Sequence, residues 1–149
     1  MINMFRLFII LILCSLTTIS YAKDDKKPTI NSAKVNNANS ISVAPSDTVT
    51  ISLSVTLGGK GKSAKWKSTG WRLVGSSGNL QCDKSVNEEG SGTYNHSFNV
   101  SAPSAAGSYN LYLVAYGDDK CNKDASAQLV LSNAVTVASV SNPSPPDTA

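Results

Sequence analysis

Apolar and polar residues alternate along the middle of the chain. From Val49 to Val55 every second residue is Val, Ile or Leu, and the residues between them are Thr or Ser. Successive side chains of a β-strand point to opposite faces, so this pattern predicts a half-buried strand with one apolar and one hydroxylated face. The same period of two predicts long strands at 93–100, 108–116 and 126–137. In 108–116 both faces are apolar, which indicates a strand in the middle of a sheet.

Shorter strands are expected at 28–35, 40–43 and 64–74, and turn residues separate all of these segments. Clusters such as LGGKGK, NEEGSG and GDDKCNKD supply the backbone angles and local hydrogen bonds that chain reversals need. About seven short strands with regular turns predict an all-β fold, an antiparallel β-sandwich. Helical periodicity is almost absent from the sequence, and no Gly-rich phosphate loop follows a strand.

The N-terminus, MINMFRLFIILILCSLTTISYA, has the three parts of a secretory signal peptide. Arg6 provides the positive charge, residues 7–16 are apolar, and a small-x-small sequence ends at Ala22. An uncleaved membrane anchor is disfavoured, because about 20 apolar residues are needed to cross a bilayer. Lipidation at Cys14 is disfavoured as well, because Leu13 stands where lipoprotein signals carry a small residue. We therefore expect a secreted protein, extracellular or periplasmic.

Removal of residues 1–22 leaves three parts: a flexible charged segment at 23–28, a domain at 29–138, and a tail or linker at 139–149 with three prolines. No later segment is apolar enough to span a membrane. Without Arg6, 12 of the 13 Lys and Arg residues remain against 10 Asp and Glu, a net charge of +2. This near balance argues against nucleic acid as a partner, since nucleic-acid-binding proteins carry a marked basic excess.

The mature chain keeps two cysteines, Cys82 and Cys121. Exported proteins fold in an oxidising compartment, so we expect these two residues to form a disulfide.

Three segments carry a resemblance to a known family. FNVSAPSAAGSYNLYLVAY resembles a sequence common in bacterial immunoglobulin-like modules, in which an Ala-Pro turn and a Gly precede an aromatic-rich penultimate strand. SISVAPSDTVTISLSV resembles the entry into their second strand, and STGWRL resembles the strand with the core tryptophan. Residues 28–137 are thus similar to immunoglobulin-like domains of large secreted or surface proteins of proteobacteria. The resemblance implies an immunoglobulin-like sandwich with Trp71 in the core and Tyr109 as a tyrosine corner, its hydroxyl bonded to backbone.

One position departs from the antibody type of this fold. Antibody-type domains carry a cysteine two residues after the tyrosine, but here Leu111 takes that place and is expected to fill the core. We therefore expect Cys82 and Cys121 to form a peripheral bridge between a middle loop and the loop after the penultimate strand.

The segment GGKGKSAKWKSTGWR contains a candidate binding surface. If 64–74 is one strand, Trp71 faces the core and Trp66 has the opposite parity, so Trp66 is expected to be partly exposed beside Lys65 and Lys67. An exposed indole among cations can stack on a sugar ring or meet an acidic glycan. The favoured alternative is that Trp66 packs under a loop while the lysines protect an edge strand.

Other polar residues do not combine into a catalytic or metal site. His96 is the only histidine, no Gly-x-Ser-x-Gly or free mature cysteine accompanies it, and we expect a structural role near the rim of the sandwich. The turn residues with oxygen ligands lack the EF-hand spacing, so a solvated turn is favoured over a calcium site. These residues are Asp118, Asp119, Asn122 and Asp124. Asn95 and Asn99 match the N-glycosylation acceptor pattern.

The sequence therefore predicts an exported, non-catalytic module that acts in binding, adhesion or spacing at the cell surface. It predicts no enzyme activity, metal or cofactor, and the partner is an unspecified surface protein or glycan. The alternative function is that of an accessory module, with carbohydrate binding as one option, of an exported hydrolase whose catalytic domain lies elsewhere. In that case 139–149 is a linker.

Overall fold

The structure is a computed structural model and describes residues 27–59, 64–74 and 79–139. The predicted signal peptide lies outside these residues, as do most of the segment at 23–28 and of the tail at 139–149. The described chain forms ten β-strands and no helix. The strands are β1 (Pro28–Val35), β2 (Ile41–Val43), β3 (Thr48–Leu57), β4 (Lys65–Trp66), β5 (Ser68–Val74), β6 (Gln81–Asp83), β7 (Glu88–Glu89), β8 (Gly92–Ser101), β9 (Gly107–Tyr116) and β10 (Leu129–Val137).

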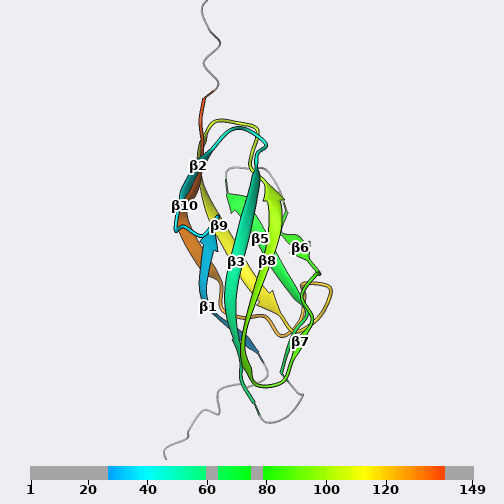
Figure 1. Cartoon of the computed structure of the whole chain (residues 1–149). Helices are drawn as coiled ribbons and strands as arrows, with labels where there is room; N and C mark the ends of the chain where they lie inside the picture. Colours follow the sequence, from blue (N-terminus) through cyan, green and yellow to red (C-terminus); the bar gives the residue numbers. More distant parts are fainter. Residues whose placement is uncertain (1–26, 60–63, 75–78, 140–149) are drawn as a thin grey trace, which may run out of the picture.

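Two main sheets face each other (Figure 1). One has the order β1-β3-β8, the other has the order β2-β10-β9-β5-β6, and β4 pairs with β7 in a small third sheet. All neighbouring strands are antiparallel except β2 and β10, which are parallel. The predicted all-β fold with antiparallel sheets is confirmed. The structure has three strands more than the seven predicted, because the segment 64–74 divides into β4 and β5, and the short strands β6 and β7 were not predicted.

Alternate residues of the long strands fill the space between the sheets. In β3 the Val, Ile and Leu side chains are buried, while the Thr and Ser side chains between them point outward. The predicted central strand is confirmed, since β9 lies between β10 and β5. Leu111 of β9 is fully buried, as predicted. The core also includes Val35, Phe98, Val100, Leu113, Ala115, Val135 and Val137.

Two tyrosines near the starts of strands make the same kind of contact, a hydrogen bond from the hydroxyl to a backbone carbonyl just before the strand. The buried Tyr109 donates its hydroxyl to the carbonyl of Ala105 at 2.7 Å, which is the bond to backbone expected of a tyrosine corner. Tyr94, two residues into β8, donates its hydroxyl to the carbonyl of Glu89 at 3.0 Å. Each of these strands begins with the sequence Gly-x-Tyr.

The predicted disulfide between Cys82 and Cys121 is present, with a Cα–Cα distance of 6.0 Å. Cys82 lies on the edge strand β6 rather than in a loop, and it pairs with Gly70 of β5. Cys121 lies in the turn after β9, and its φ of 52° is in the left-handed region. The bridge therefore fastens the edge of the five-stranded sheet to the turn between β9 and β10.

The prediction that Trp66 is partly exposed is wrong, and its side chain is buried, as the favoured alternative expected. Residues 64–74 do not form one strand: β4 pairs with β7, and the chain shifts at Lys67 before β5 pairs with β9. The alternation of inward and outward side chains is therefore interrupted between β4 and β5, so the position of Trp71 does not predict that of Trp66. Trp66 is 0% exposed. Trp71 does face Phe98 between the sheets, with ring centroids 6.3 Å apart, but it remains partly exposed. The fully buried core tryptophan is thus Trp66.

Candidate functional site

The predicted cationic surface around Trp66 does not exist as a free patch. Lys67 Nζ lies 2.5 Å from Glu89 Oε1 and Lys65 Nζ lies 3.4 Å from the same atom. Lys67 also donates to Asn87. The hydrogen bond from Lys67, followed by the charge of Lys65, lowers the pKa of Glu89 below its ordinary value. Because the indole is buried and the ammonium groups have partners, the proposed sugar-stacking role of Trp66 has no support.

His96 has two polar partners that the sequence did not reveal. Its Nε2 lies 3.1 Å from Asp83 Oδ2 and 3.0 Å from Ser85 Oγ. Ser85 Oγ in turn donates to Asp83 Oδ1 at 2.7 Å. The imidazole packs edge-on against Trp66 at 5.8 Å and stacks on Phe98 at 6.1 Å between centroids.

This set of a serine, a histidine and an aspartate does not form a catalytic relay. In such a relay one imidazole nitrogen faces the carboxylate and the other faces the hydroxyl. Here Nε2 faces both groups, and the Ser85 hydroxyl proton is directed to Asp83, so Nε2–H donates to both oxygens. The arrangement joins β6 to β8 at the edge of the sandwich, which is a structural role near the rim.

The acidic turn after β9 is organised by Asp118. Its Oδ1 accepts the backbone N–H groups of Asn122 at 3.1 Å and Lys123 at 2.9 Å. Desolvation acts to raise the pKa of Asp118, but the backbone hydrogen bonds outweigh it and hold the pKa below its ordinary value. Among the described residues, no three His, Cys, Asp or Glu side chains are grouped to hold a metal ion. Asp118 is therefore a cap of its own turn.

The outer face of the three-stranded sheet is covered by hydroxyl and amide groups; we call it the hydroxyl face. Cross-strand hydrogen bonds of 2.8 Å join its side chains in three pairs: Thr50 with Asn99, Ser52 with Ser97, and Thr56 with Thr93. Each pair lies directly opposite in the register of β3 and β8. These bonds pair five of the hydroxyl groups of this face within the sheet.

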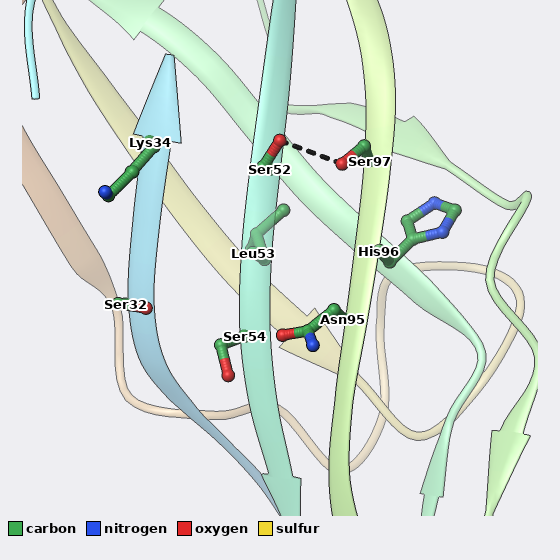
Figure 2. A pocket seen from close by; sticks show the side chains of 8 residues that line it. All are labelled: Ser32, Lys34, Ser52, Leu53, Ser54, Asn95, His96 and Ser97. Carbon is green, nitrogen blue, oxygen red and sulfur yellow. Dashed lines mark hydrogen bonds between the residues drawn. The ribbon is translucent and has the colours of Figure 1, made fainter. Parts of the chain in front are cut away.

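A shallow hollow of about 190 Å³ lies on the hydroxyl face (Figure 2). Short serines at its centre leave space between longer side chains on the neighbouring strands. The polar side chains that line it include Ser32, Lys34, Ser52, Ser54, Asn95 and Ser97. Asn95 and Asn99, the glycosylation acceptor positions, both lie on this face, where Asn99 accepts the Thr50 hydroxyl.

The outer face of the five-stranded sheet has the opposite character, and we call it the apolar face. Its centre is β9, and side chains from β5, β10 and the segment before β6 extend it. Arg72 stacks on the ring of Tyr112, with Cζ 4.9 Å from the centroid. The apolar face consists of Val74, Leu80, Tyr112, Val114, Tyr116 and Val130, and Val74, Leu80 and Val130 are 38%, 41% and 42% exposed.

The fold and these surfaces define a class: an all-β protein of two facing sheets, fastened by one disulfide. Comparison with known protein families and with curated proteins finds no match to this chain in either. The part of the chain that the structure describes includes no helix able to cross a membrane. The disulfide is typical of a protein from an oxidising compartment.

Proposed function

We propose that this protein is an exported, non-catalytic immunoglobulin-like module that binds a partner at the cell surface through its apolar face. The observation that carries the proposal is the contrast between the two outer faces. One is covered by hydroxyl groups that bond to each other, whereas the other exposes aliphatic and tyrosine side chains around a stacked arginine. Aromatic residues and arginine are enriched at binding interfaces, and clustered exposed apolar side chains mark interaction sites.

The strand arrangement supports the immunoglobulin-like part of the proposal. Three strands, β1-β3-β8, face a second sheet in which β9 is flanked by β10 and β5. The bond from Tyr109 to the backbone at the start of β9 is a further feature of such sandwiches. The predicted signal peptide and the disulfide support export.

Binding of the mature chain, from Lys23 onward, to immobilised cell-surface extract tests this function. Val114→Lys places a charge at the centre of the apolar face, and Ser54→Lys places the same charge on the hydroxyl face as a matched control. We expect Val114→Lys to weaken capture by about tenfold or more, as at an interface centre, and Ser54→Lys to leave it unchanged. Circular dichroism verifies that both variants are folded. Equal capture by both variants contradicts the proposal.

The hollow on the hydroxyl face favours a second candidate function, an accessory module of an exported hydrolase that binds carbohydrate. Its hydroxyl, amide and ammonium groups match the donors and acceptors of a sugar. No Trp, Tyr or Phe side chain lines the hollow for stacking, so this candidate ranks second. A glycan array probed with the mature chain and with Ser54→Lys separates the two: only carbohydrate binding in the hollow is lost in Ser54→Lys.

A further inference from the structure

Along the strands, the apolar face has two ends of different charge, and the two ends lie at equal distances in residues from its centre. Gly70 and Val114 lie directly opposite each other in the register of β5 and β9. Two residues away in one direction the paired positions are Arg72 and Tyr112. Two residues away in the other direction they are Ser68 and Tyr116.

The end at Ser68 is next to the acidic turn. Ser68 Oγ donates to the carbonyl of Asp118 at 2.5 Å and lies 3.2 Å from Cys121 Sγ. Asp119 follows and is exposed. With Lys120, Lys123 and Asp124, the turn carries three carboxylates and two ammonium groups. This end of the apolar face is therefore bordered by a turn with an excess of negative charge.

The end at Arg72 carries a guanidinium group that pairs with no carboxylate among the described residues. Arg72 is exposed, stacks on Tyr112, and has no Asp or Glu oxygen within ion-pair distance among the described residues. A guanidinium held on an aromatic ring is oriented for a carboxylate from outside, because less rotational freedom is lost when the pair forms.

Neighbouring side chains fill the space over Gly70 at the centre of the apolar face. A Cβ atom added to Gly70 would lie 2.7 Å from Leu80 Cδ2 and 2.9 Å from Tyr116 Cε2, so both side chains lie close over the β5 backbone. An apolar sheet surface with this gap filled suits the packing of one sheet on another, in which strand directions stay within about 30° of each other.

We propose that the apolar face binds a second copy of this chain, a refinement that rests on the proposed function of this face. The twofold axis of the dimer lies in the plane of the interface. It runs across the strands and passes beside Gly70 and Val114. This axis exchanges the two ends, so Tyr112 of each copy covers Tyr116 of the other. Arg72 of each copy then lies beside the acidic turn of the other, at Asp119. The contact is self-complementary in both its apolar and its charged parts.

A second copy fits this face better than a glycan does. Its most exposed apolar side chains, Val74, Leu80 and Val130, are aliphatic, and Arg72 already stacks on the Tyr112 ring, so the face offers little free aromatic surface to a sugar ring. The chain itself supplies the acidic group that Arg72 lacks. The face has six apolar side chains and Arg72, whereas a standard interface has about 20–30 residues a side, so we expect a weak dimer with a dissociation constant on the order of 10–100 μM.

Sedimentation equilibrium of the oxidised mature chain from about 5 μM to about 1 mM tests the proposal. The wild-type chain and Ser54→Lys are expected to dimerise alike, and Val114→Lys is expected to stay monomeric. Arg72→Glu sets a new carboxylate against Asp119 of the other copy, and Asp119→Arg sets two guanidinium groups against each other, so each variant alone is expected to be monomeric. A mixture of these two variants restores an opposite-charge contact and is expected to form a heterodimer.

Monomeric wild-type protein across the whole range overturns the proposal, as does a mixture of Arg72→Glu and Asp119→Arg that stays monomeric. Val114→Lys that dimerises like the wild-type chain overturns it as well. These outcomes leave the proposed function testable on its own, because capture from surface extract that Val114→Lys abolishes would then identify a different partner for the same face. Loss of dimerisation in Ser54→Lys would move the interface to the hydroxyl face and also contradict the proposal.

Discussion

The indole of Trp66 is held by one polar and several apolar contacts. Its Nε1 donates to the buried hydroxyl of Thr69 at 3.1 Å, and its ring packs against His96. His96 is itself fixed by Asp83 at the rim. A buried donor and acceptor that satisfy each other are costly to separate, because the group left behind loses its hydrogen bond without regaining water. Trp66 therefore joins the small sheet of β4 and β7 to the main core.

Replacing Trp66 by phenylalanine removes both the ring volume and the donor to Thr69. We expect a loss of about 2–4 kcal/mol in the free energy of unfolding, measured by urea denaturation, from the cavity and the unpaired hydroxyl together. Trp71→Phe is the matched control and is expected to cost about 1 kcal/mol, since this ring is only partly buried. A larger loss for Trp71→Phe than for Trp66→Phe would show that the two environments are assigned the wrong way round.

The hydroxyl of Tyr109 gives a second prediction. Tyr109→Phe keeps the buried ring but leaves the carbonyl of Ala105 without its donor, so we expect stability to fall by about 1–2 kcal/mol. Tyr116→Phe serves as control: no hydrogen bond involves the Tyr116 hydroxyl among the described residues, and we expect a change within about 0.5 kcal/mol. Thermal unfolding of both variants makes the comparison, and equal melting temperatures would contradict it.

At the scale of strands, the sequence predicted the long elements and the short β2, but it missed β6 and β7 and did not separate β4 from β5. β3, β8, β9 and β10 have nine or ten residues each, enough for alternate burial to appear as a pattern. β4, β6 and β7 have two or three residues, and their positions depend on neighbours distant in the chain. The contacts of His96 with Asp83 and Ser85 follow from the location of β6, so periodicity gave no sign of them. The repeated Gly-x-Tyr was a visible signal for the bond of Tyr94.

The pairing of β4 with β7 predicts a dependence on pH. The lowered pKa of Glu89 means that its carboxylate stabilises the fold above its ordinary pKa of 4.5, and that this contribution is lost as the pH falls through the lowered value. Glu89→Gln is expected to be less stable than the wild-type chain at pH 7, and the difference is expected to be smaller at about pH 3. Urea midpoints at both pH values measure it.

Glu88→Gln is the control for this pH dependence, because no ion pair of Glu88 occurs among the described residues. Its difference from the wild-type chain is expected to be the same at both pH values. If the destabilisation caused by Glu89→Gln persists unchanged in acid, the ion pairs with Lys65 and Lys67 do not account for it.

At the scale of the whole molecule, the disulfide connects the edge strand β6 to the turn after β9, two segments with few backbone hydrogen bonds to the sheets. β6 is a three-residue edge strand, and the turn after β9 has no strand of its own. Cys82 and Cys121 are separated by 39 residues, so the bridge closes a loop that includes β7, β8 and β9. Because β8 and β9 belong to different main sheets, the bridge keeps segments of the two layers near each other in the unfolded chain as well.

Replacing both cysteines by serine is expected to lower the free energy of unfolding by about 4 kcal/mol, from the chain entropy of a loop of this length. Whole domains are typically stable by about 5–15 kcal/mol, so the variant is expected to be close to unfolding at body temperature. Urea denaturation of the oxidised chain and the double variant measures the loss. Dithiothreitol is expected to lower the urea midpoint of the wild-type chain only. Equal urea midpoints for the oxidised wild-type chain and the double variant would contradict the prediction.

The parallel pairing of β2 with β10 has a mechanical consequence. The start of β1 and the end of β10 lie at opposite ends of the two facing sheets (Figure 1). A pulling force applied through the two termini therefore runs lengthwise along the strands. In the ladder from Ile41 to Val43, such a force slides one strand past the other and loads all the bonds together rather than one after another. We therefore expect the parallel pair of β2 and β10 to resist a stretching force applied through the ends of the two sheets.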